Sequence, residues 1–352
     1  MAKTRTPAAP TLDHVALAAG VSTATVSRAI NQPQSVRAEL RERVLRAVAR
    51  LGYVAHAGAR AMSLRRSGTV GVVVPTIDNA IFARSLQAFQ ARMVQSGRHV
   101  LLAISDYDAE QELAQVGNLI ARGVDAVALT GTSQKPELIE RLAQRGLPWV
   151  HSGSFPADKG SACVGFRNRA AIAKAARYLL DLGHRRIALL AGITAGNDRA
   201  SERVRGVRET LQRAGVRLPS GWVVEAAYEL QAAREATREL LVLSPRPTAI
   251  VCGNDVLAYG AMLEALSQAL PVPQQLSVVG FDDLEMSRHW QPGLTTIHVP
   301  TERMWTLAAE HLIARLDGSV TAPQQHEIEV ELVVRGSTAP PPSTRATSAR
   351  RS

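Results

Sequence analysis

The chain has 352 residues, 46% of them hydrophobic, and carries a formal net charge of +10. This length and apolar content are enough for about two or three folded units and exclude a disordered or fibrous protein. No apolar stretch approaches the roughly 18 residues of a membrane helix, and the N-terminus lacks the apolar segment of a signal peptide. We therefore expect a cytoplasmic protein with no membrane partner.

The sequence also argues against an enzyme. Its two cysteines, Cys163 and Cys252, each lie in an apolar run typical of a buried strand, which excludes a disulfide framework or a cysteine-rich zinc site. We find no phosphate-binding loop, no nucleophile elbow and no His-Glu-x-x-His motif. We expect no cofactor, no metal and no catalytic residue.

The positive charge is concentrated at the N-terminus. Residues 1–67 hold 11 Lys/Arg against 3 Asp/Glu, residues 68–337 hold 27 against 28, and residues 338–352 hold 3 against none. A basic head on a nearly neutral body is typical of a polyanion-binding module joined to a regulatory or catalytic domain. A solvated basic helix surface would give the same charge, so the motifs must distinguish the two.

Three short helices are predicted in this basic head. The first ends at Gly20, the second begins after Ser22 as its N-cap and is stopped by Pro33, and the third has Ser35 as a possible cap and ends at Gly52.

The first two helices have the spacing of a helix-turn-helix. Ala16 is small enough for a close crossing, Gly20 permits the sharp turn, and Val26 fills the angle between the helices. In a DNA-binding helix-turn-helix the second helix enters the major groove. We therefore expect residues 1–54 to form a three-helix DNA-binding headpiece.

Residues 11–16, 19–28 and 51–53 resemble the headpiece of the LacI/GalR family of bacterial transcription regulators, and the resemblance continues through nearly the whole chain. It implies a set of DNA-binding residues: Thr11, Leu12, Ser22, Thr23, Ala24, Ser27, Arg28 and Asn31. Because Ala24 cannot donate a hydrogen bond, Thr23 and Arg28 would carry most of the base discrimination. The alternative for Arg28 is a solvated arginine on an exposed helix face.

The segment 55–68 is predicted to be a linker of small residues. The matching family segment is a hinge that becomes helical on the operator and inserts a leucine between base pairs in the minor groove. Here Met62 stands at the leucine position, with Ala59 and Arg60 among the implied DNA contacts, and Ala55 departs from the usual proline. The alternative is a plain flexible linker.

From residue 69 to 337, strand-like runs alternate with helical segments. The predicted strands lie at 69–74, 100–104, 126–129 and 149–151, and in a second series at 187–190, 223–224, 249–251 and 278–281. Two such series predict an α/β fold with two parallel sheets covered by helices. The resemblance implies a periplasmic-binding-protein-like core, in which two lobes close around a small molecule.

Ligands bind such sheets at the carboxyl ends of the strands, where this chain is polar. By position in the family pattern, the implied effector-binding residues are Ile81, Phe82, Arg199, Arg203, Tyr228, Asn254 and Asp282. The planar guanidinium of Arg203 can form two hydrogen bonds to neighbouring hydroxyls or to a carboxylate. A second arginine, Arg199, favours a sugar acid or phosphosugar as ligand unless Asp198 or Glu202 neutralises its charge. The alternative is a capping or loop-anchoring role, above all for Asn254.

Residues 338–352 are rich in proline and small residues and are predicted to be disordered. No leucine heptads indicate a tetramer, so we expect a homodimer. The combined expectation is a nucleoid-associated repressor that binds a near-palindromic operator in double-stranded DNA and is controlled by a small carbohydrate or sugar-acid effector. The alternative is an architectural or constitutive DNA-binding repressor with no effector.

Overall fold

The computed structural model describes residues 9–54, 66–155 and 160–342. The chain forms two compact units that divide between Gly68 and Thr69. The implied DNA contacts Ala59, Arg60 and Met62 lie outside the described residues. Within the described ranges, no helix is long and apolar enough to cross a membrane.

The first unit is a three-helix bundle. Its elements are α1 (Leu12–Ala19), α2 (Thr23–Asn31), the 3-10 turn η1 (Pro33–Ser35) and α3 (Ala38–Leu51). Gly20 and Gly52 take the left-handed conformation that ends α1 and α3, as predicted. Val15, Val26 and Val44 are fully buried at the centre of the bundle. The predicted helix-turn-helix is therefore present.

The predicted cap at Ser35 is wrong. Ser35 is the last residue of η1, and its hydroxyl donates to the Gln32 carbonyl at 2.7 Å. Val36 then takes an extended conformation, so α3 begins later, at Ala38, with Arg37 at its N-cap position.

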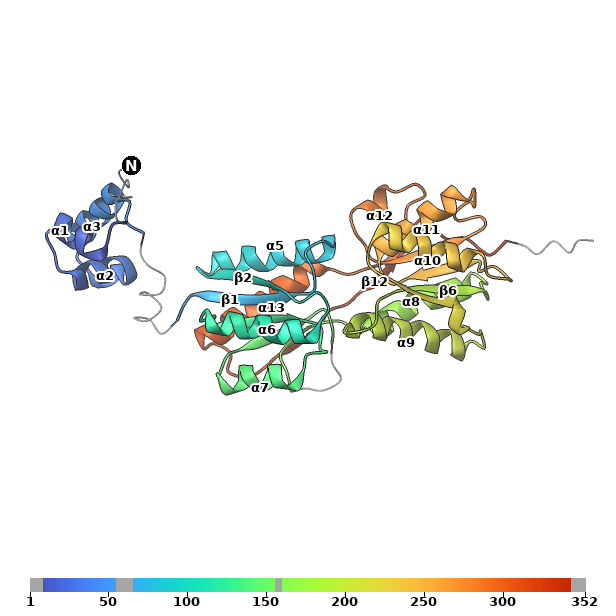
Figure 1. Ribbon diagram of the computed structural model, residues 1–352, viewed down its shortest axis with the longest axis horizontal. Helices are drawn as coiled ribbons and strands as arrows, with labels where there is room; N and C mark the ends of the chain where they lie inside the picture. Colours follow the sequence, from blue (N-terminus) through green and yellow to red (C-terminus); the bar gives the residue numbers. More distant parts are fainter. Residues whose placement is uncertain (1–8, 55–65, 156–159, 343–352) are drawn as a thin grey trace, which may run out of the picture. The chain divides into compact units, whose positions relative to one another are not determined.

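The second unit contains two six-stranded sheets, each in its own lobe (Figure 1). The N-terminal lobe has strand order β11-β5-β4-β3-β1-β2, and its strands are β1 (Thr69–Val74), β2 (His99–Ile104), β3 (Ala126–Thr130), β4 (Trp149–Ser152), β5 (Cys163–Gly165) and β11 (Gln325–Glu327). The C-terminal lobe has order β12-β10-β9-β8-β6-β7, and its strands are β6 (Ile187–Gly192), β7 (Val223–Ala226), β8 (Ala249–Cys252), β9 (Ser277–Asp282), β10 (Thr295–His298) and β12 (Glu331–Val333).

Helices flank both sheets. Those of the N-terminal lobe are α5 (Ala80–Gln95), α6 (Ala109–Ala121), α7 (Pro136–Gln144) and α13 (Thr301–Asp317). Those of the C-terminal lobe are α8 (Asn168–Asp181), α9 (Asp198–Arg213), α10 (Leu230–Leu241), α11 (Asp255–Ser267) and the short α12 (Met286–His289), with a 3-10 turn η2 (Ser220–Trp222) before β7. The pairs α8 with α9 and α10 with α11 pack together, as α13 does with α5.

The chain passes between the lobes three times: from β5 to α8, from β10 to α13, and from β11 to β12. The return of α13 to the N-terminal lobe was not predicted, because strictly alternating strands and helices do not reveal which sheet each one joins. All strand pairs are parallel except β10 with β12, which is antiparallel. Both free cysteines are buried, as expected for strand residues.

The predicted disorder after residue 337 is wrong at its start. The carbonyl of Ala339 accepts hydrogen bonds from the His184 ring and the Ser277 hydroxyl, at 2.9 and 3.0 Å. The Thr338 hydroxyl contacts that of Tyr178 at 3.1 Å. Backbone groups of this segment find partners on the C-terminal lobe, so the ordered chain continues past the predicted boundary.

Candidate functional site

The exposed face of α2 presents the predicted base-reading residues. Val26 and Ala29 of this helix are buried, whereas Ala24 and Arg28 are exposed and Thr23 is half-buried. The Arg28 Nε donates to the Ala24 carbonyl at 3.4 Å, which lays the side chain along the helix and leaves its terminal nitrogens unused by that bond. This face can therefore offer one guanidinium and several small side chains to a groove.

Other predicted DNA contacts have structural partners. The Ser22 hydroxyl accepts from the Thr25 amide and caps α2, and Thr11 forms a reciprocal capping box with His14 at the start of α1. Leu12 packs partly against the bundle core. The Asn31 amide donates to the Ser27 hydroxyl at 3.3 Å, so these two side chains lie together at the end of α2.

A cavity lies between the two lobes of the second unit. All seven predicted effector residues line it: Ile81, Phe82, Arg199, Arg203, Tyr228, Asn254 and Asp282. Eleven further lining residues are outside the set that the family pattern implied, although Asn79 and Asn197 were among the polar residues noted at strand ends: Asn79, Ser85, Tyr107, Thr130, Gly153, Phe166, Asn197, Val299, Thr301, Met304 and Trp305. Among the described residues, no group of three His, Cys, Asp or Glu side chains could hold a metal ion.

The apolar groups of the cavity come mainly from the N-terminal lobe. This lobe contributes Phe82 from α5 and Met304 and Trp305 from α13, together with polar side chains: Asn79, Ser85, Tyr107, Thr130 and Thr301. The C-terminal lobe forms a polar wall of mainly amide, carboxylate, phenol and guanidinium groups. A ligand with apolar surface and several polar groups matches this lining.

Arg203 is held rigidly in the polar wall. Its Nε donates to Asn168 Oδ1 at 2.9 Å, and its Nη1 donates to the Gly253 carbonyl at 2.7 Å. The guanidinium lies 3.6 Å from the ring centroid of Phe281, a cation-π contact. Its Nη2 lies 3.9 Å from Asp282 Oδ1, so a fixed donor and a fixed acceptor face the cavity together.

The position of Asp282 depends on Asp255 beneath it. Asp282 and Asp283 have φ angles of 110° and 56°, conformations that L residues adopt only when their surroundings impose them. The fully buried Asp255 carboxylate accepts hydrogen bonds at 2.7 Å from the Leu284 amide and the Ser287 hydroxyl, which fixes this turn. Burial raises the pKa of Asp255 to about 7 and that of Asp282 to about 6, although Arg203 and Arg199 oppose the rise at Asp282.

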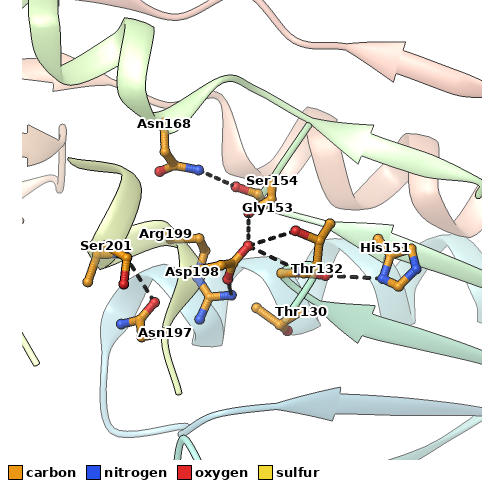
Figure 2. Close-up of polar contacts among 12 residues, drawn as sticks. Thr130, Thr132, His151, Gly153, Ser154, Asn168, Asn197, Asp198, Arg199 and Ser201 are labelled. Carbon is orange, nitrogen blue, oxygen red and sulfur yellow. Dashed lines mark hydrogen bonds and ion pairs between the residues drawn. The ribbon is translucent and has the colours of Figure 1, made fainter. Parts of the chain in front are cut away.

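The predicted second arginine, Arg199, has a carboxylate partner. Its Nη1 donates to Asp198 Oδ1 at 3.0 Å, whereas Glu202 pairs with Arg169 and Arg205 instead. Figure 2 shows Asp198 between the start of α9 and the loops that carry Thr132 and Ser154. Of the two neutralising residues considered, Asp198 therefore fills that role.

Asn254 is a helix cap and also lines the cavity. Its Oδ1 accepts from the Leu257 amide at 2.9 Å and caps α11, and the residue also lines the cavity.

Two of the lining residues are tyrosines whose rings are in contact. The rings of Tyr107 and Tyr228 have centroids 6.2 Å apart and are inclined by 50°. Burial raises the pKa of both phenols, so both are neutral at pH 7. Tyr107 lies three residues after the end of β2, so the rule that strand ends carry ligand residues could have identified it.

Comparison with known proteins agrees with both units. Residues 11–56 match bacterial regulatory proteins of the lacI family, and residues 176–338 match the periplasmic binding protein-like domain. The HTH-type transcriptional regulator GntR of Pseudomonas aeruginosa is 34% identical over 336 residues, covering 95% of this chain and 97% of GntR. The HTH-type transcriptional repressor PurR of Escherichia coli is 30% identical, covering 94% and 98%.

Solved structures show the same architecture. The lac repressor dimer bound to operator and the anti-inducer ONPF is 27% identical, with a TM-score of 0.83 over 94% of this chain and all of that one. The transcriptional regulator CelR in its cellobiose complex is 31% identical, with a TM-score of 0.69 over 93% of this chain and 99% of that one. The chain is a DNA-binding transcriptional regulator that belongs to the LacI family.

Proposed function

We propose that this regulator is a dimeric repressor that binds a near-palindromic operator and responds to a small carbohydrate or sugar acid in the interlobe cavity. The observation that carries the proposal is the meeting of the seven predicted effector residues, from both lobes, around one cavity. Small-molecule sites in proteins are concave and combine apolar lining with a few polar groups, as this cavity does.

The chemistry of the cavity suits a polyhydroxylated ligand. Arg203 supplies donors and Asp282 an acceptor 3.9 Å apart, an arrangement that two neighbouring hydroxyls can satisfy. Phe82 and Trp305 offer apolar surface to the C–H face of a sugar ring. Because Arg199 already has a carboxylate partner, the preference for a sugar acid over a neutral sugar rests on donors of Arg199 that Asp198 does not use.

A two-fold operator requires a two-fold protein. Leu266 on α11 and Met286 on α12 are 75% and 53% exposed. Leu266 lines an apolar groove together with residues such as Met262, Leu270 and Trp290. Exposed apolar surface of this kind favours self-association, and we expect light scattering to give twice the mass of the 37.8 kDa chain.

Effector and operator binding are linked through the core. A ligand that prefers one lobe arrangement changes operator affinity, typically by ~1–3 kcal/mol, and the operator changes ligand affinity by the same factor.

A thermal-shift screen against neutral sugars, sugar acids and phosphosugars tests the effector. A ligand present at about one hundred times its Kd adds ~2.7 kcal/mol to the stability of the folded protein, which raises the Tm by several degrees. The shift should disappear in Arg203→Leu and in the near-isosteric Asp282→Asn, and Arg199→Leu should abolish it only for an anionic ligand. A ligand that still raises the Tm of both Arg203→Leu and Asp282→Asn would bind outside this cavity. No hit in any class would favour the effector-free repressor.

A further inference from the structure

Asp198 belongs to the C-terminal lobe but finds most of its hydrogen-bond donors in the other lobe. Its Oδ2 accepts from the Thr132 amide and the Thr132 hydroxyl, both at 3.0 Å, and from the Ser154 hydroxyl at 2.6 Å (Figure 2). Thr132 follows β3 and Ser154 follows β4, whereas Asp198 is the first residue of α9. Three of its four recorded hydrogen bonds therefore cross between the lobes.

The fourth bond joins Asp198 to the cavity. Its Oδ1 accepts from Nη1 of Arg199, and both side chains are less than one-fifth exposed. The pair occupies space that Gly131 of the N-terminal lobe leaves open, since a Cβ at Gly131 would overlap both Nη1 of Arg199 and Oδ1 of Asp198. The place of Arg199 in the cavity wall thus depends on a residue that the opposite lobe holds.

A capping role does not account for this arrangement. The cap of α9 is Asn197, whose Oδ1 accepts from the Ala200 amide at 3.3 Å. Burial alone would raise the pKa of Asp198, but Arg199, Ser154 and Thr132 outweigh it and hold the pKa below its ordinary value. Of these contacts, Arg199 belongs to the same lobe, whereas those of Ser154 and Thr132 exist only when the lobes are together.

We propose that Asp198 is a positioning residue that couples lobe closure to the cavity: it holds the lobes together without ligand and fixes Arg199 in the cavity wall. This inference deepens the proposed function and rests on it only for the role of the cavity. The closed arrangement is then the resting state, and an effector acts by shifting an equilibrium that Asp198 already biases.

Hydrogen exchange of the Thr132 amide tests the contact directly, because the acceptor of this amide is across the cleft. The measurement uses the intact protein without ligand or DNA. We expect protection in the wild type and its loss in Asp198→Ala. The matched control is Glu202→Gln, which removes the same charge one turn later on α9 from a side chain paired with Arg169 and Arg205 rather than with the other lobe. It should keep the protection.

A second pair of variants removes the donors and keeps the carboxylate. Ser154→Ala and Thr132→Val each delete one hydroxyl, and we expect about fivefold faster exchange of the backbone amide at position 132 per hydrogen bond lost. The NMR signal of the Arg199 guanidinium, identified by its absence in Arg199→Lys, should shift and broaden in both variants although neither touches Arg199.

Several results would overturn the inference: a Thr132 amide that exchanges in the wild type as fast as in Asp198→Ala, equal loss in Glu202→Gln, or an unchanged Arg199 signal in the hydroxyl variants. If Asp198→Ala does not fold, Ser154→Ala and Thr132→Val still test whether the contacts of Asp198 across the lobes position Arg199. Because no ligand is added, failure here is separate from failure of the carbohydrate screen.

Discussion

The Asp282 carboxylate lies 3.9 Å from the Arg203 guanidinium, and both side chains are at least nine-tenths buried. Despite this cation, burial raises the pKa of Asp282 from 3.8 to about 6. The folded protein therefore binds the Asp282 proton more tightly than the unfolded chain does. The resulting stabilisation is fully present below pH 4 and is lost as the pH rises through 6.

Asp282→Asn removes this titration. We expect the free energy of unfolding of the wild type to fall relative to that of Asp282→Asn between pH 4 and 7, by up to about 3 kcal/mol for a shift of about two pKa units. Urea denaturation at a series of pH values measures the difference. Parallel curves for the two proteins would show that Asp282 ionises in the fold as readily as in the unfolded chain.

His311 on α13 has the opposite pH dependence. It is 4% exposed, neither ring nitrogen has a hydrogen-bond partner among the described residues, and burial together with Arg315 and His326 lowers its pKa to about 4. The unfolded chain binds the proton more readily, so the wild type loses stability as the pH falls from 6.5 to 4.

His311→Leu should reduce the loss of stability between pH 6.5 and 4. It should also raise the free energy of unfolding at pH 7 by about 1 kcal/mol, because an unpaired buried polar group is removed. His99→Leu, at an exposed histidine of the same lobe, is the control and should change stability little. If the free energy of unfolding of His311→Leu falls as steeply with decreasing pH as that of the wild type, then His311 does not cause the loss of stability in acid.

Gly131 and Gly146 separate backbone strain from contact with the Asp198–Arg199 pair. Both have left-handed φ angles, 77° and 64°, so alanine at either position costs roughly 1 kcal/mol of conformational energy. A Cβ at Gly146 meets open space, whereas one at Gly131 overlaps the pair. We expect Gly131→Ala to lower the free energy of unfolding by at least about 1 kcal/mol more than Gly146→Ala. Equal losses would mean that the pair moves aside freely.

Local signals in the sequence were sufficient for the headpiece and for most strands. Gly20 and Ser22 specify a helix end and a helix start through their own backbone and side-chain chemistry, so the structure agrees with them. The prediction that Ser35 caps α3 was wrong because Pro33, two residues earlier, starts a 3-10 turn that Ser35 ends. A serine can end one turn as readily as it can cap the next helix.

Long-range pairing was not predictable. Asp282 ends β9 and Arg203 lies within α9, and both were found by their place in the family pattern, but Trp305 is on a helix that returns from the other lobe. The contact of Asp198 with Thr132 joins residues 66 positions apart in opposite lobes. Sequence reasoning therefore identified the cavity residues that the family pattern implies, and missed Tyr107 after β2 and residues such as Trp305 that a chain crossing brings to the cavity.

Arg28 provides the sharpest test of DNA reading. It is exposed on α2, with its Nη atoms free of the bond that Nε makes to Ala24. If those atoms contact a base edge, Arg28→Ala weakens operator binding by about 1–3 kcal/mol and leaves binding to unrelated DNA nearly unchanged. Arg50→Ala, at an exposed arginine near the end of α3, removes the same charge and should have a much smaller effect on the difference between operator and unrelated DNA.

The salt dependence completes this test. Each phosphate neutralised contributes about −0.9 to the slope of log affinity against log salt concentration. Arg28→Ala should leave the slope for operator binding nearly unchanged if the contact is to a base, and should reduce its magnitude by about one if the contact is to phosphate. Equal losses of affinity on operator and on unrelated DNA, with the smaller slope, would move Arg28 from base reading to backbone binding and leave Thr23 as the principal hydrogen-bonding reader on α2.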